Sequence, residues 1–193
     1  IAVSATGPWQ SLPALIAAAR EKPGTIRFGS NGNGTSSHAK LEILKRLAGV
    51  DITHVPYRGA APAATDVIAG NIDGLIAAIP DVGRNERLRL LAMTTEQRLA
   101  RWPDVPSVAE LGLAPLVAAN WFGISGPAGI PAPVADRLNA ALVESLATPA
   151  LTERLSELGA APNRLDRPGF TALVAADMAR WAQIVREAGI KAD

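Results

Sequence analysis

Strand-like and helix-like segments alternate over the first 124 residues of the chain, and only helix-like segments follow. Each helical pattern in the first part ends at glycine or at Pro-Gly, and short apolar runs separate the helices. A chain that returns to a sheet after each helix builds parallel strands, so the pattern predicts an α/β fold with a mostly parallel sheet. The helices are expected at residues 11–20, 36–48, 61–69, 106–111, 131–146, 149–158 and 167–188. The strands are expected at residues 1–3, 25–28, 51–55, 73–79, 88–94 and 116–124.

Charge and composition exclude several classes of protein. The 19 basic and 18 acidic residues give a net charge of +1, and no block of like charge predicts nucleic-acid or membrane-surface binding. There is no cysteine, so disulfides, thiol nucleophiles and iron–sulfur clusters are excluded. With two histidines, the chain offers few candidate ligands for a metal, and no metal or other cofactor is predicted.

A Gly/Asn-rich loop between an expected strand and an expected helix is the strongest local feature of the sequence. Its glycines let backbone N–H groups turn toward one point, and the helix N-terminus adds partial positive charge. Together with the hydroxyl groups, these donors suit a carboxylate or a phosphate. A tight turn with a helix cap is the alternative, since the loop lacks both the P-loop lysine and the dinucleotide spacing. The candidate ligand-binding residues are Ser30, Gly32, Asn33, Gly34, Thr35 and Ser36.

A second candidate lies just after the expected strand at 51–55. Tyr57 is the only tyrosine, and the neighbouring Arg58 is suited to carboxylate recognition, although a surface arginine in a turn is the alternative. No catalytic residue is predicted, because there is no G-x-S-x-G elbow. We expect His38 to be a capping or surface residue, and His54 to be half-buried and hydrogen-bonded.

Read together, these segments resemble the periplasmic substrate-binding proteins of tripartite tricarboxylate transporters, the Bordetella uptake gene family. The order and spacing of the matching segments extend through nearly the whole chain. They are residues 12–24, 28–30, 32–38, 49–59, 61–63, 90–92, 103–110, 121–123, 127–129 and 137–139, with Arg98 and Trp181.

The resemblance implies a type II periplasmic-binding-protein-like α/β fold, in which two hinged lobes close on a ligand. Residues 4–118 would form the second, ligand-binding lobe, and 119–193 would supply the crossover strand and the C-terminal helices of the first lobe. The function implied is that of a periplasmic solute-binding component that takes up a small organic acid and presents it to membrane subunits. The glycine-rich loop would grip a ligand carboxylate, and Tyr57 and Arg58 would lie on the second cleft-facing loop.

The sequence departs from the family pattern at its start and at residues 77–79. Family members begin with a leader, a strand and a Pro-Gly-Gly loop upstream of the first residues found here. We therefore expect one complete lobe, weak or absent binding by this chain alone, and self-association through the apolar stripe of residues 170–185. Residues 77–79 are Ala-Ala-Ile where the family is more polar, so ligand contacts there are not expected.

Two other functions remain open from the sequence. One is an enzyme that binds a carboxylated or phosphorylated substrate at the same loop. The other is the effector-binding domain of a transcription regulator, because such regulators share the two-lobe fold.

Overall fold

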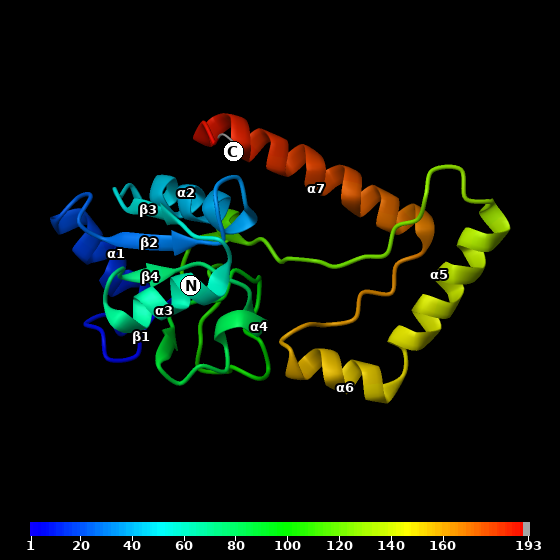
Figure 1. Cartoon of the computed structure of the whole chain (residues 1–193), viewed down its shortest axis with the longest axis horizontal. Helices are drawn as coiled ribbons and strands as arrows, with labels where there is room; N and C mark the ends of the chain where they lie inside the picture. The colour runs from blue at the N-terminus through cyan, green and yellow to red at the C-terminus, as the bar shows by residue number, and fades with distance from the viewer. Residues whose placement is uncertain (191–193) are drawn as a thin grey trace. The chain divides into compact units, whose positions relative to one another are not determined.

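The computed structural model describes residues 1–190, which fall into two compact units. Unit 1 contains residues 1–119 together with the C-terminal residues from Ile184, and unit 2 contains residues 120–183. Unit 1 holds the sheet, and unit 2 is built of helices and extended connections (Figure 1).

The sheet of unit 1 is mixed, with strand order β3-β2-β4-β1-β5. β2 runs parallel to β3 and β4, whereas β1 runs antiparallel to β4 and β5. The prediction of a mostly parallel sheet is therefore wrong for β1, because no helical crossover links β1 to either neighbour and fixes its direction. The strands are β1 (Ala2–Ser4), β2 (Arg27–Ser30), β3 (Thr53–Pro56), β4 (Gly74–Leu75) and β5 (Leu88–Leu90), shorter than expected at β4 and β5.

Helix boundaries in unit 1 follow the capping residues of the sequence. The Ser11 hydroxyl accepts a hydrogen bond from Ala14 N at 3.3 Å, and Gly49 and Gly70 end their helices with φ of 62° and 78°. The expected helices at 11–20, 36–48 and 61–69 are confirmed to within one residue. The helical elements are α1 (Leu12–Glu21), α2 (Ser36–Ala48), α3 (Ala60–Ala69), α4 (Ile79–Val82) and the 3₁₀ turn η1 (Ala114–Leu116). The helix expected at 106–111 is absent: Ser107 forms an isolated bridge with Met93, and residues 108–111 form turns.

The two faces of the sheet carry α2 and α3 respectively. A Cβ on Gly29 would contact Ala63 of α3 and Ile72, so this position of β2 faces α3. Because side chains alternate along a strand, Phe28 and Ser30 face α2. Both are fully buried, so the α2 face is closed to solvent at the end of β2.

Unit 2 contains α5 (Ala132–Leu146), α6 (Pro149–Glu157) and most of α7 (Arg167–Ala188). The strand expected at 116–124 is wrong: no residue of this segment is in a strand, because among the described residues no neighbouring strand pairs with it. Trp121 instead packs edge-to-face on Phe170, with ring centroids 5.4 Å apart, and its Nε1 donates to Asp177 at 2.7 Å.

The helices of unit 2 leave much apolar surface exposed. α5 and α6 contain no buried residue, and Phe122 and Met178 are 91% and 69% exposed. Within residues 1–190, no helix has both the length and the hydropathy that crossing a membrane requires.

Gly74→Ala tests the packing of the sheet. A Cβ at this position would clash with the Phe28 ring and lie 2.9 Å from the Ala2 carbonyl oxygen. We expect the free energy of unfolding to fall by about 1–3 kcal/mol, measured by denaturant titration with circular dichroism. The control is Gly126→Ala, where the nearest atom would be Ile130 Cδ1 at 3.5 Å. Equal stability of the two variants would contradict the packing described.

Candidate functional site

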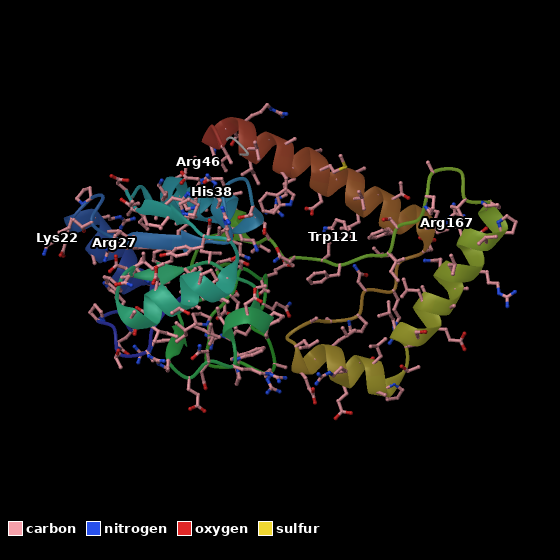
Figure 2. All side chains as sticks on the ribbon, viewed as in Figure 1. Lys22, Arg27, His38, Arg46, Trp121 and Arg167 are labelled. Carbon is pink, nitrogen blue, oxygen red and sulfur yellow. The ribbon has the colours of Figure 1, made fainter. Side chains whose placement is uncertain are left out.

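Two loops leave the sheet side by side at the carboxyl end of β2 and β3. The parallel register pairs Ser30 with Pro56, and Tyr57 N donates to the Ser30 carbonyl at 3.1 Å just beyond the last pair. α2 begins a few residues after β2, and α3 begins a few residues after β3. Figure 2 shows Lys22 and Arg27 toward the start of β2 and His38 toward its other end. The N-termini of both helices therefore belong to one edge of the sheet, where α/β proteins bind ligands.

The glycine-rich loop is held by its own hydroxyl groups. Thr35 caps α2: its Oγ1 donates to the Gly32 carbonyl at 2.7 Å, and the same oxygen accepts from His38 N at 3.5 Å. Ser37 Oγ lies 3.0 Å from Thr35 Oγ1 and accepts from Asn31 N at 2.9 Å. The capped turn considered from the sequence is therefore present. It is compatible with binding, because it sets the loop before any ligand arrives.

Glycine is required at position 32 for two reasons. Its φ of 132° lies in the region that L side chains rarely adopt, and a Cβ would lie 3.2 Å from the Tyr57 carbonyl oxygen. The first loop thus approaches the backbone of the second loop closely, as the register of β2 and β3 demands.

Two histidines lie directly against this loop. The imidazoles of His38 and His54 stack with centroids 3.9 Å apart and an interplanar angle of 15°. His54 Nε2 is 2.6 Å from Ser30 Oγ, and His38 Nδ1 accepts a hydrogen bond from Gly34 N at 3.3 Å. The sequence predicted a capping or surface role for His38 and a hydrogen-bonded, half-buried His54, but not their contact. The sequence feature that could have indicated this contact is the placement of one histidine in the first turn of α2 and of the other on the side of β3 that faces α2.

Burial lowers the pKa of both histidines. The pKa of His54 falls to about 4, through burial first and then the neighbouring His38, with Lys45 adding to the effect and Glu42 opposing it. The pKa of His38 is lowered by burial, which Glu42 opposes. Both imidazoles are therefore neutral at pH 7, and each offers one ring nitrogen as a hydrogen-bond acceptor and the other as a donor.

The electrostatic character of this edge comes from the helix ends and one arginine. Neither α2 nor α3 has an acidic residue in its first turn, and Gly59, the N-cap residue of α3, provides no side-chain cap. Arg58 is exposed, and its side chain makes no hydrogen bond or ion pair with any residue in 1–190. Two helix N-termini and an unpaired guanidinium favour an anion.

Tyr57 lies on the α3 side of the sheet. Its hydroxyl donates to Asp66 Oδ2 at 2.7 Å, while Asp66 Oδ1 accepts from Asn71 at 3.0 Å. The ring packs against the core cluster that includes Ala63 and Ile72. Its neighbour Arg58 is the exposed residue of the pair, so the second loop offers a guanidinium rather than a phenol at its surface.

Two other features carry less chemistry. A groove of about 430 Å³ lies between the C-terminal half of α2 and the end of α7, where Arg46 forms an ion pair with Glu187. It is at the opposite end of α2 from the glycine-rich loop. In the described part of the chain, no three His, Asp or Glu side chains come together as a metal site.

Comparison with known proteins gives a consistent result. The model of the TctC family, the tripartite tricarboxylate transporter family receptor, matches residues 1–190. Protein BugT of Bordetella pertussis is 34% identical over 94% of this chain and 56% of its own length. A Rhodopseudomonas palustris structure, Rpa4515 with adipate, has 31% identity and a TM-score of 0.89 over 98% of this chain and 64% of its own. The structure of MatC from the same organism with bound malate has 26% identity and a TM-score of 0.81, covering 95% of this chain and 65% of its own.

These matches confirm the predicted fold class. The chain has the α/β fold of periplasmic binding proteins, including that of BugD, to which it is similar with a TM-score of 0.81. It spans between half and three fifths of the length of three curated relatives that it matches.

The partly buried position of the Tyr57 ring can be tested by titration. Burial raises the pKa of Tyr57 to about 12, with the hydrogen bond to Asp66 as the second cause. Tyr57 is the only tyrosine, so ultraviolet absorbance of tyrosinate reports it alone. We expect no ionisation near pH 10 in the folded chain and a lower pKa in Asp66→Ala. Ionisation near pH 10 in the folded wild type would place the phenol in solvent instead.

Proposed function

The chain belongs to the tripartite tricarboxylate transporter receptor family, and from this premise we propose that it binds a small organic acid at the edge formed by α2 and α3. In this role it is the periplasmic solute-binding component of a tripartite transporter. The acid occupies a cleft between two lobes, unit 1 supplies the ligand-binding lobe, and the closed form is presented to the membrane subunits.

The observation that carries the proposal is the convergence of two helix N-termini and Arg58 at one sheet edge. The β2–β3 register brings both loops there, and the Thr35 cap holds the first loop in shape. A carboxylate placed at this edge accepts from backbone donors and from the guanidinium, which are charge-assisted hydrogen bonds. The candidate residues of the first loop fall into two groups. Ser30 and Gly32 hold the loop in shape, through the contacts of the Ser30 hydroxyl with His54 and Gly32, whereas residues 33–36 lie at the start of α2.

The ligand class follows from the same chemistry. The two similar structures contain adipate and malate, and both ligands are dicarboxylates. One carboxylate of such a ligand suits the helix N-termini, and Arg58 provides a second positive group close by. A small dicarboxylate is therefore the ligand class we propose.

The enzyme alternative is disfavoured by the burial of Ser30. Its Oγ lies 2.6 Å from His54 Nε2, a distance typical of a nucleophile and its base. However, Ser30 is fully buried, and its hydroxyl contacts Gly32 at both N and O at 3.2 Å. No substrate carbonyl can approach an oxygen enclosed in this way.

The effector-domain alternative shares the binding chemistry, and the upstream sequence of the gene distinguishes it: a DNA-binding segment favours a regulator and a secretory leader favours a receptor.

Nuclear magnetic resonance with malate and adipate tests the site directly, because it detects and locates even weak binding, and we expect binding by this chain alone to be weak at best. We expect saturable shifts of backbone amides in residues 31–37 and 58–60. The matched control ligand is adipamide, which has the same carbon chain without charge and should produce no saturable shift. Equal responses to the acid and the amide, or shifts confined to other residues, would contradict the proposal.

Arg58→Ala tests the second loop. Loss of the exposed guanidinium should weaken dicarboxylate binding by up to about fivefold, because an exposed ion pair contributes little more than this. Lys22→Ala is the control: it removes the same charge at the opposite end of β2 and should leave the affinity unchanged. Equal affinities of the two variants would remove Arg58 from the site.

The exposed apolar side chains of unit 2 predict self-association of this chain. Phe122 and Ile124 are 91% and 73% exposed, and exposed aromatic and branched residues close together in sequence promote association. We expect sedimentation velocity to detect dimers or larger species that the double variant F122S/I124S reduces. A wild-type chain that stays monomeric at high concentration would contradict this expectation.

A further inference from the structure

Each of the two stacked histidines holds a different part of the glycine-rich loop. His38 contacts Gly34, near the helix start, and His54 contacts Ser30, at the end of β2. No other side chain of α2 or β3 that is described here makes a hydrogen bond to Gly34. The pair therefore spans the loop from its first residue to the turn before α2.

The bond to Gly34 fixes the protonation state of His38. A backbone N–H can only donate, so Nδ1 must carry a lone pair, and the ring proton must be on Nε2. Nε2 faces Glu42 Oε1 at 4.0 Å, which favours this tautomer. A proton on Nδ1 would place two N–H groups against each other and break the contact with Gly34.

His54 acts through Ser30. The Ser30 Oγ that contacts His54 Nε2 also accepts from Gly32 N at 3.2 Å, so the ring position determines the position of the first glycine. The stacking of the rings at 3.9 Å couples the two contacts, since two imidazolium rings at this separation repel each other. Protonation of one ring therefore disfavours protonation of the other.

We infer that His38 and His54 are positioning residues for the ligand-binding loop: His54 holds it at Ser30, and His38 holds it at Gly34 only while the His38 ring is neutral. The loop loses its contact at Gly34 when His38 takes up a proton, and carboxylate binding weakens. This last consequence rests on the proposed function, whereas the contact with Gly34 does not.

The charged groups around the pair set the direction of the pH dependence. Glu42 stabilises the protonated rings, and Lys45, which lies 2.8 Å from the same Glu42 carboxylate oxygen, opposes protonation. Burial exceeds both effects and lowers the pKa of each ring. The unfolded chain takes up protons first as pH falls below about 6.5, so the stabilisation from the neutral pair is complete above that pH and is lost below it.

The experiment compares wild type, His38→Ala and His38→Asn by nuclear magnetic resonance between pH 8 and pH 5. Asparagine places an acceptor oxygen near the position of Nδ1 and has no titrating proton, so it should retain the loop at every pH. In wild type, the chemical shift of the Gly34 amide should change with pH at the same midpoint as the His38 ring resonances. Malate affinity should fall about fivefold more in wild type than in His38→Asn over this range, and the same probe in both chains cancels the titration of malate itself.

The outcomes separate the inference from the proposed function. A Gly34 amide that follows His38 supports the positioning role whether or not malate binds, and saturable malate shifts confined to residues outside 31–37 and 58–60 would contradict the proposed function alone. A Gly34 amide chemical shift that is insensitive to pH and unchanged in His38→Ala overturns the inference. Malate binding of equal affinity in wild type and His38→Ala also overturns it, and leaves the proposed function intact.

Discussion

The parallel pairing of β2 with β3 is the interaction on which the candidate site depends. Its register sets Ser30 opposite Pro56 and continues through the bond from Tyr57 N to Ser30. The same register places His54 on the face where α2 supplies His38. A slip of one residue would turn His54 toward α3 and separate it from Ser30 Oγ, so the loop geometry and the histidine contacts are consequences of a few backbone hydrogen bonds.

Features set by neighbouring residues were predictable from the sequence. Gly49 and Gly70 end α2 and α3 as the sequence predicts, because capping depends on the chemistry of a few adjacent positions. The glycine-rich loop and its place between strand and helix were predicted for the same reason. The resemblance to the receptor family rested instead on the order and spacing of segments through nearly the whole chain, and the family match confirms it. The direction of β1 was not predictable, because its partners β4 and β5 are distant in the sequence.

Long-range contacts also explain what was missed at the site and in unit 2. The stack of His38 on His54 depends on strand register and on the face of α2, and neither is visible in local sequence. The apolar segment at 116–124 has the composition of a strand, but a strand forms only when a neighbouring strand pairs with it, and no described strand does so here. Trp121 therefore contacts Phe170 and Asp177 instead.

A receptor gains affinity when its donors are in place before the ligand arrives, and the bonds among Gly32, Thr35 and Ser37 provide that order. The central claim is that this ordered loop receives a carboxylate at the start of α2. A crystal structure of the chain grown with a high concentration of malate tests it most directly. The account predicts a malate carboxylate oxygen at about 2.7–3.2 Å from the backbone N–H groups of Ser36 and Ser37, the first residues of α2. Malate bound elsewhere, with this loop contacting only solvent, would contradict it.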